Sequence, residues 1–273
     1  AICMLSLTEK ILLTPKALSS DIQVLWIEHD SIGRWLKKNP FLSRLRKLSK
    51  HVLTICVSES SRRTYIELGW NPSRVVAIPN GIDPSRFEVD NKNPNNSTNG
   101  NKTSIGCVAR LHKQKGIDIL LRSIADLPQA HLTIVGIGEE KKSLINIIKE
   151  LRIMDRVQIL DKVGKLGEFY KSLDIFVLPS RTNDPFGMVA AEAMCCGIPT
   201  VVTSACGISQ DINDGKNGIV VKEDSIDALR EALSFLMTHA DRRKAIGEAG
   251  KTKALTEFTI KSMVDAYERC LQS

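Results

Sequence analysis

The stretch "PSRTNDPFGMVAAEAMCCGIPTVV", residues 179–202, contains the signals that decide the fold. It begins at the end of an aliphatic run at 175–180 that predicts a buried strand. Turn-forming residues follow, then a small-residue run at 187–196 that predicts a helix. A β-branched run at 199–204 predicts a second strand. Strand, helix and strand in this order form a βαβ unit, in which the two strands run parallel.

The same alternation continues along most of the chain. Further strands are expected at 23–29, 52–58, 74–80, 104–109, 131–137, 157–160 and 218–221. Further helices are expected at 115–126, 139–151, 166–173 and 225–238, and as two helices in the last 35 residues, broken at 257–259. Near-continuous aliphatic strands between helices are typical of parallel sheets covered on both faces. The predicted fold class is α/β, with parallel sheets in two units.

The two units are expected to differ in completeness. Residues 104–255 supply six strands, a complete unit. Residues 1–87 supply only about three, so we expect them to be the remnant of a larger domain from which about a hundred residues are missing. Between them, 88–103 is rich in Asn and nearly free of apolar residues, which predicts a flexible loop. Residues 256–273 predict a closing helix.

The bulk composition narrows the class of protein. Apolar residues make up 42% of the 273, enough for a sizeable core, and no run of 18 apolar residues predicts a membrane-spanning helix. Seven cysteines without a CxxC pair argue against a disulfide framework or a zinc site and favour a reducing compartment. The net charge of +7 suits anionic partners. Nucleic acid is not expected among them, because the chain lacks an aromatic-basic sheet or a reader helix.

The positive charge gathers at 33–50, where bases alternate with apolar side chains such as Trp35 and Leu45. This pattern fits a surface helix that rests on anionic lipid. A solvated helix face explains it equally well, so both interpretations stay open.

Two bases lie just after the strand at 104–109, where parallel sheets bind ligands. Arg110 and Lys115 precede a helix start, and two cations beside helix amides suit a diphosphate. Two solvated surface bases are the alternative.

Two acids lie on either side of the helix start in the opening stretch, Asp184 and Glu192. Eight helical residues span roughly 12 Å, too far for two acids to share one reacting atom. They could instead hold two hydroxylated parts of one ligand with an anion between them, as in a nucleotide sugar. A capping Asp and an ordinary helical Glu are the alternative.

Five segments together resemble the retaining glycosyltransferases of family 4, the group 1 glycosyl transferases with the GT-B fold. They are the opening stretch, "IPNGIDPSRF" (78–87), "ARLHKQKGIDILL" (109–121), "LTIVGIGEE" (132–140) and "INDGKNGIVV" (212–221). The resemblance implies two Rossmann-like domains. The N-terminal one would bind the acceptor and the C-terminal one the nucleotide sugar, and the last helix would cross back to the N-terminal domain.

The resemblance also implies roles for particular residues. Arg110 and Lys115 match the basic pair on the donor diphosphate, and Asp184 matches the acid on the donor hexose, although the family has Glu there. Glu192 matches the acid on the ribose. The segment whose backbone amides meet the donor matches Phe186, Gly187, Met188 and Val189, and His29 resembles the histidine at the reaction centre.

The implied reaction moves a hexosyl group, with retention, from a UDP- or GDP-sugar to a glycan or lipid-linked acceptor. Such transfer serves cell-surface polysaccharide or glycolipid synthesis, in the cytoplasm or peripherally on the cytoplasmic face of a membrane. No cofactor is expected beyond the nucleotide sugar as co-substrate. No Asp-x-Asp cluster is present, so we expect metal independence. The alternative is a non-catalytic fragment that binds a nucleotide sugar and transfers nothing.

Overall fold

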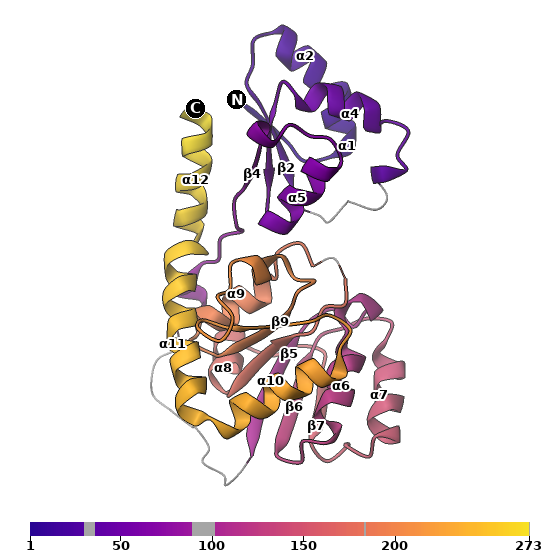
Figure 1. Ribbon diagram of the computed structural model, residues 1–273, viewed down its shortest axis with the longest axis vertical. Helices are drawn as coiled ribbons and strands as arrows, with labels where there is room; N and C mark the ends of the chain where they lie inside the picture. Colours follow the sequence, from indigo (N-terminus) through magenta and orange to yellow (C-terminus); the bar gives the residue numbers. More distant parts are fainter. Residues whose placement is uncertain (30–35, 89–101, 183, 273) are drawn as a thin grey trace. The chain divides into compact units, whose positions relative to one another are not determined.

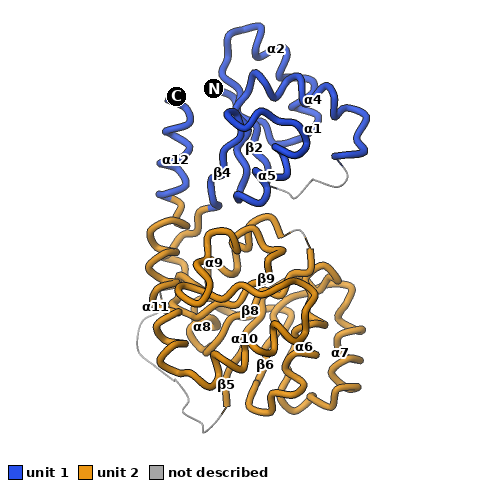
Figure 2. The backbone as a smooth tube through the Cα atoms, viewed as in Figure 1, with its two compact units in different colours: residues 1–80, 261–273 blue, residues 81–260 orange. Residues whose placement is uncertain are grey.

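The computed structural model describes residues 1–29, 36–88, 102–182 and 184–272. The chain divides into two compact units, coloured separately in Figure 2. The first unit combines 1–80 with 261–273, and the second comprises 81–260.

The first unit contains a parallel sheet in the order β1-β2-β3-β4. Figure 1 labels two of its strands, β2 and β4. Its strands are β1 (Ile2–Met4), β2 (Val24–Glu28), β3 (Leu53–Cys56) and β4 (Val75–Ala77). The last three were predicted, and β1 was missed because three residues are too few to show a period. Its helices are α1 (Leu7–Leu12), α2 (Thr14–Ser19), α4 (Leu42–Ser49), α5 (Glu59–Glu67) and α12 (Ile260–Gln272).

Both faces of this sheet are covered, as parallel strands require. One face carries Trp26, which packs in a cluster with Leu45 of α4 and Tyr65 of α5. The other face carries Leu25, Ile55 and Ile78, which pack against α12 through Met263, Ala266, Tyr267 and Cys270.

The predicted surface helix at 33–50 is not one continuous helix in the residues described, which begin at 36. Helical residues 36–37 are followed by a turn at 38–41, and α4 begins only at Leu42. Pro40 lies in that turn, where its missing N–H and its ring disfavour an unbroken helix. Leu36 and Leu45 are buried in the core of the first unit, so they do not belong to an exposed apolar face.

The second unit contains a six-stranded parallel sheet among the described residues, in the order β10-β9-β8-β5-β6-β7. Its strands are β5 (Thr103–Val108), β6 (Ala130–Val135), β7 (Val157–Leu160), β8 (Ile175–Leu178), β9 (Thr200–Thr203) and β10 (Ile219–Val221). All six were predicted. The α/β fold class with two parallel sheets is therefore confirmed.

The helices of the second unit also follow the predicted pattern. They are α6 (Ile117–Ala125), α7 (Lys141–Glu150), α8 (Leu166–Lys171), α9 (Met188–Cys195), α10 (Ile226–Thr238) and α11 (Ala240–Glu257), with the 3-10 turns η2 (Pro84–Phe87), η3 (Lys113–Lys115) and η4 (Gly207–Gln210). The break predicted at 257–259 lies between α11 and α12. The predicted flexible loop at 88–103 falls mostly on 89–101, outside the described residues. None of the helices described is both long and apolar enough to cross a membrane.

The strand order reverses between β5 and β8. From β5 the chain moves outward to β6 and β7, then returns to pair β8 with the other side of β5, with Ile105 opposite Ile175. Where the order reverses, the connections leave in opposite directions and open a space at the carboxyl ends of the strands. The loops after β5 and β8 border this space.

Candidate functional site

The turn after β5 carries the two predicted bases. Gly116 ends η3 with a φ of +62°, and a Cβ at this position would lie 2.1 Å from the carbonyl oxygen of Pro179. Only glycine therefore lets this turn press against the loop after β8. Arg110 is exposed, and its side chain makes no hydrogen bond or ion pair within the described residues. The side chain of Lys115 is only 19% exposed.

Lys115 forms an ion pair with Asp184, with 2.7 Å between Nζ and Oδ2. The same carboxylate oxygen accepts a hydrogen bond of 3.1 Å from the Ser180 hydroxyl, and Asp184 is buried. The structure thus joins two predicted site residues that are 69 positions apart in the sequence. The resemblance places the two residues on different parts of one ligand, and their spacing in the sequence gives no sign of this direct contact.

The backbone N–H and carbonyl of Asp184 are both held by the loop after β9. Asp184 donates its N–H to the Ala205 carbonyl at 3.2 Å, and Gly207 donates to the Asp184 carbonyl at 2.8 Å. Two residues on, Ile208 donates to the Phe186 carbonyl at 2.6 Å. The Asp184 carboxylate therefore belongs to a residue whose backbone is hydrogen-bonded to the loop after β9.

Helix α9 begins at the end of this segment. Gly187 has a φ of +104°, which lets the chain turn into the helix, and Met188 and Val189 are its first residues. The first amides of a helix have no partner within it and carry partial positive charge. The Phe186 side chain is buried against Phe258, with ring centroids 5.5 Å apart. A ligand in this loop could therefore contact Phe186 only through its backbone.

Glu192 lies in α9, half-buried, with a different kind of partner. The Tyr170 hydroxyl donates a hydrogen bond of 2.7 Å to Glu192 Oε2. Burial raises the pKa of Glu192, while the Tyr170 hydrogen bond and the charge of Arg86 act against this rise. Within the described residues, no hydrogen bond or ion pair joins Glu192 to Asp184.

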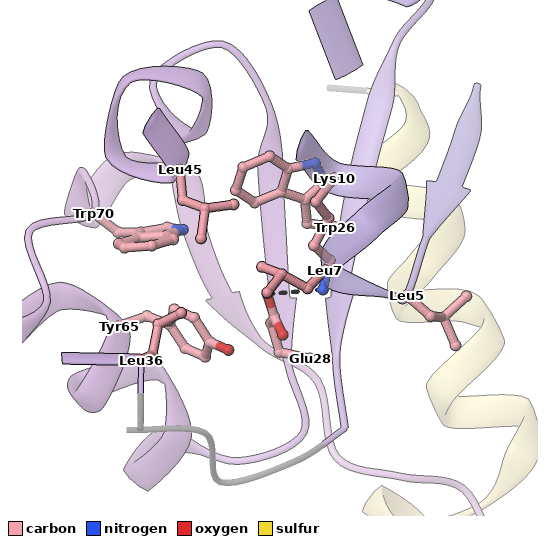
Figure 3. A pocket seen from close by; sticks show the side chains of 9 residues that line it. All are labelled: Leu5, Leu7, Lys10, Trp26, Glu28, Leu36, Leu45, Tyr65 and Trp70. Atoms are coloured by element: carbon pink, nitrogen blue, oxygen red, sulfur yellow. Dashed lines mark ion pairs between the residues drawn. The ribbon is translucent and has the colours of Figure 1, made fainter. Parts of the chain in front are cut away.

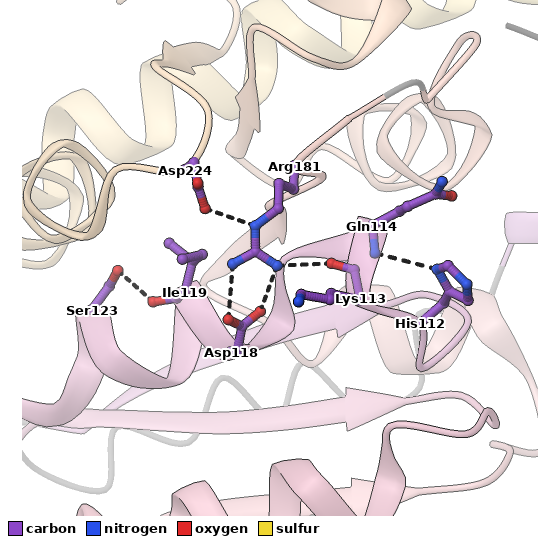
Figure 4. Close-up of polar contacts among 8 residues, drawn as sticks. All are labelled: His112, Lys113, Gln114, Asp118, Ile119, Ser123, Arg181 and Asp224. Carbon is purple, nitrogen blue, oxygen red and sulfur yellow. Dashed lines mark hydrogen bonds and ion pairs between the residues drawn. The ribbon is translucent and has the colours of Figure 1, made fainter. Parts of the chain in front are cut away.

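Arg181 is a residue of this region that sequence analysis missed (Figure 4). Its guanidinium forms a bidentate pair with Asp118 at 2.9 and 3.2 Å and a second pair with Asp224 at 2.7 Å. It also donates to the Lys113 carbonyl at 2.9 Å. Arg181 therefore ties the loop after β8 to the turn that carries Lys115. Its position directly after a predicted strand could have marked it as a candidate site residue. Its acidic partners lie 63 and 43 positions away in the sequence, so no local motif indicates the ion pairs.

His29 lies in the first unit, directly after β2, and is exposed. The preceding Glu28 forms a buried ion pair with Lys10 of α1, 2.9 Å between Oε1 and Nζ, in a small pocket also lined by Trp70 (Figure 3). Lys10 donates as well to the Ile27 carbonyl at 3.0 Å. This pair fixes the end of the strand from which His29 projects.

Metal-binding side chains do not cluster in the part of the chain that the structure describes, where no three His, Cys, Asp or Glu residues are grouped to hold an ion. Metal independence stays a prediction. The seven cysteines are free thiols.

Comparison with known proteins gives matches along both units. A profile of the family "Glycosyl transferases group 1" matches residues 88–253, and one of "Glycosyltransferase Family 4" matches residues 11–86. A mannosyltransferase of Corynebacterium glutamicum, GDP-mannose-dependent and named for monoacylated phosphatidylinositol monomannoside, is 28% identical over 84% of this chain and 64% of its own length. The lipopolysaccharide core biosynthesis glycosyltransferase LpsE of Rhizobium meliloti is 25% identical over 80% of this chain and 64% of its own. The chain thus spans about three fifths of the length of such relatives.

Solved structures agree on the fold. HepE of Anabaena, crystallised with UDP, has a TM-score of 0.89 at 20% identity, covering 99% of this chain and 78% of that protein. WaaG, a glycosyltransferase involved in lipopolysaccharide biosynthesis, has a TM-score of 0.71 at 19% identity, covering 93% and 79%. The GT-B fold expected from the sequence is confirmed, as is the resemblance itself. A match over residues 88–253 covers more than half of the chain, which therefore belongs to the glycosyl transferases group 1 family.

Proposed function

We propose that the second unit binds a UDP- or GDP-linked sugar and that the protein transfers its hexosyl group to a glycan or lipid-linked acceptor. The observation that carries this proposal is the convergence of Lys115 and Asp184 where the strand order reverses. A cation, a carboxylate and the start of a helix lie there together. Membership of the glycosyl transferases group 1 family supports assigning this constellation to glycosyl transfer.

In this proposal the donor diphosphate lies against Arg110, Lys115 and the first amides of α9. Phosphate oxygens take over the Lys115 ammonium, which Asp184 holds in the free chain. The freed carboxylate then accepts hydrogen bonds from hydroxyls of the hexose. Glu192 accepts them from the ribose.

The transfer that we propose retains configuration at the anomeric carbon. The bond from that carbon to the diphosphate oxygen breaks, and the acceptor oxygen forms its bond on the same face of the sugar. The acceptor proton passes to the departing phosphate. Two cations and helix amides stabilise the charge that develops on the leaving group, so no metal ion is required. We assign to His29 the role of the family's reaction-centre histidine, which belongs to the acceptor-binding domain.

The acceptor class is inferred from the relatives. Two of them are named for phosphatidylinositol mannosides and for the lipopolysaccharide core, which favours synthesis of glycolipid or cell-surface polysaccharide on the cytoplasmic face of a membrane. Anionic lipid could be met by the exposed bases of segment 33–50, which include Lys37, Lys38, Lys47 and Lys50. Leu36 and Leu45 are buried, whereas Phe41 is exposed, so this contact would rest mainly on the bases, with Phe41 as an apolar side chain beside them. We expect no nucleic-acid partner.

Calorimetry with UDP, GDP, UDP-glucose and GDP-mannose tests the proposal. We expect either the uridine or the guanosine compounds to bind the full chain and to raise its melting temperature, since a ligand that binds the native state stabilises it. Release of free sugar or transfer to a lipid extract is then measured with the donor that binds. Binding without either reaction supports the non-catalytic alternative, and binding of none of the four refutes the proposal.

A further inference from the structure

Tyr170 is a buried aromatic residue at the end of α8 whose ring is held on several sides. It has no exposed surface, and its ring centroid lies 5.5 Å from that of Phe176, 6.0 Å from Phe169 and 6.1 Å from Phe87. A ring packed in this way has little freedom to rotate or shift. The position of its hydroxyl is therefore set by the aromatic cluster.

That hydroxyl is directed at one oxygen of Glu192. The Tyr170 O–H lies 2.7 Å from Oε2, a short bond of the kind expected for a hydroxyl on a carboxylate. Burial and the nearby carboxylate raise the pKa of Tyr170, so the phenol keeps its proton and serves as the donor. Within the described residues, the other oxygen, Oε1, makes no hydrogen bond or ion pair with a side chain.

We propose that Tyr170 is a positioning residue that locks the Glu192 carboxylate for hydrogen bonding to the ribose of the nucleotide. A glutamate has three rotatable side-chain bonds. When a ligand binds a glutamate that is free to rotate, ordering the side chain lowers its conformational entropy and weakens binding. Tyr170 orders it beforehand by holding Oε2. Oε1 then faces the sugar hydroxyls. This inference rests on the proposed function, which assigns the ribose to Glu192.

The experiment compares two ligands across four forms of the full chain. The ligands are UDP or GDP, whichever binds, and the 2′,3′-dideoxy form of the same nucleotide, which lacks the ribose hydroxyls. The proteins are the wild type, Tyr170→Phe, Glu192→Ala and the control Tyr267→Phe, which removes a phenol from α12. Tyr170→Phe keeps the ring and its aromatic neighbours, and thermal melting verifies that it folds.

We expect Tyr170→Phe to lower the preference for the ribonucleotide over the dideoxynucleotide by about fivefold, the effect of a typical hydrogen bond. Its affinity for the dideoxynucleotide should equal that of the wild type, and Tyr267→Phe should change neither. Equal losses for both ligands, or no loss, overturn the positioning role. A preference that persists in Glu192→Ala instead refutes the ribose assignment in the proposed function. Failure of UDP and GDP to bind the wild type removes both.

Discussion

The two acids of the opening stretch lie eight positions apart yet meet different surroundings. Asp184, in the loop after β8, faces the ammonium of Lys115 and the hydroxyl of Ser180. Glu192, inside α9, faces the neutral phenol of Tyr170. Both are held by a directed hydrogen bond, but among the residues that the structure describes only Asp184 has a cation in direct contact.

Because of this difference, the two acids affect the stability of the ligand-free protein in opposite directions. The charge of Asp184 is compensated within the fold by Lys115, so removal of either partner leaves an uncompensated charge. The charge of Glu192 is half-buried beside a neutral group, and burial raises its pKa. Removing the first charge should therefore destabilise the free protein, whereas removing the second should stabilise it.

The largest effect is expected from Asp184→Asn. The substitution keeps a hydrogen-bond acceptor for Ser180 but leaves the Lys115 ammonium, 19% exposed, without an anionic partner. Removing one member of a mostly buried pair costs about 3 kcal/mol of unfolding free energy. Urea unfolding of the full chain at neutral pH measures the loss.

The matched control is Asp161→Asn, which breaks a Lys–Asp pair at the surface. Lys141 and Asp161 are 39% and 60% exposed, so this pair should contribute less than about 1 kcal/mol. If both substitutions lower the unfolding free energy equally, burial does not distinguish the Asp184 pair from a surface pair, and the expected difference between them is refuted.

The second effect concerns the other half of that pair. Lys115→Ala should weaken binding of the nucleoside diphosphate by about 10- to 100-fold, because a charged hydrogen bond is lost. The nucleoside monophosphate should lose less, since it lacks the outer phosphate. Calorimetry with both ligands measures the difference. Lys113→Ala, two positions earlier on the same exposed turn, should bind as the wild type does; a diphosphate affinity unchanged in Lys115→Ala would contradict the assignment.

The sequence predicted the fold where patterns repeat over many residues. Aliphatic runs such as 131–137 and 175–180 became strands of a parallel sheet because only buried strands tolerate apolar side chains on both faces. It failed for β1, which has three residues, and for 33–50, where alternating bases and leucines suggested one helix across Pro40. Short elements and single prolines act locally and leave little periodic signal.

The residues of the candidate site could be chosen from the sequence, but their contacts with one another could not. Arg110, Lys115 and Asp184 could be singled out because they follow strands that meet at one edge of the sheet. The pairing of Lys115 with Asp184 could not, since it depends on Gly116 lying against Pro179, a contact between distant loops. Tyr170 was missed for a related reason. A tyrosine in a helical pattern is normally interpreted as a core residue, and only the structure shows that its hydroxyl donates a hydrogen bond to Glu192.

The smallest effect, and the one of opposite sign, is expected from Glu192→Gln. Burial raises the folded-state pKa of Glu192 above its ordinary 4.5, so the neutral form suits the fold better than the ion. Stability from this group is fully present below pH 4.5 and is lost as the pH rises through the folded-state pKa. At pH 7 the wild type bears that cost and Glu192→Gln does not. The variant should be more stable by about 0.5–1 kcal/mol, the scale of an ordinary single substitution.

The pH dependence of this gain separates charge from packing. Glutamine keeps an acceptor for Tyr170 and nearly the same shape, so the gain should disappear when the wild-type carboxyl is protonated below pH 4.5. Thermal melting of both proteins across this range measures it. A gain that persists in acid, or a loss at pH 7, would mean that Glu192 resembles Asp184 in having its charge compensated by the fold. Weaker binding of the ribonucleotide to the same variant would show that the charge is kept for the ligand at the expense of stability.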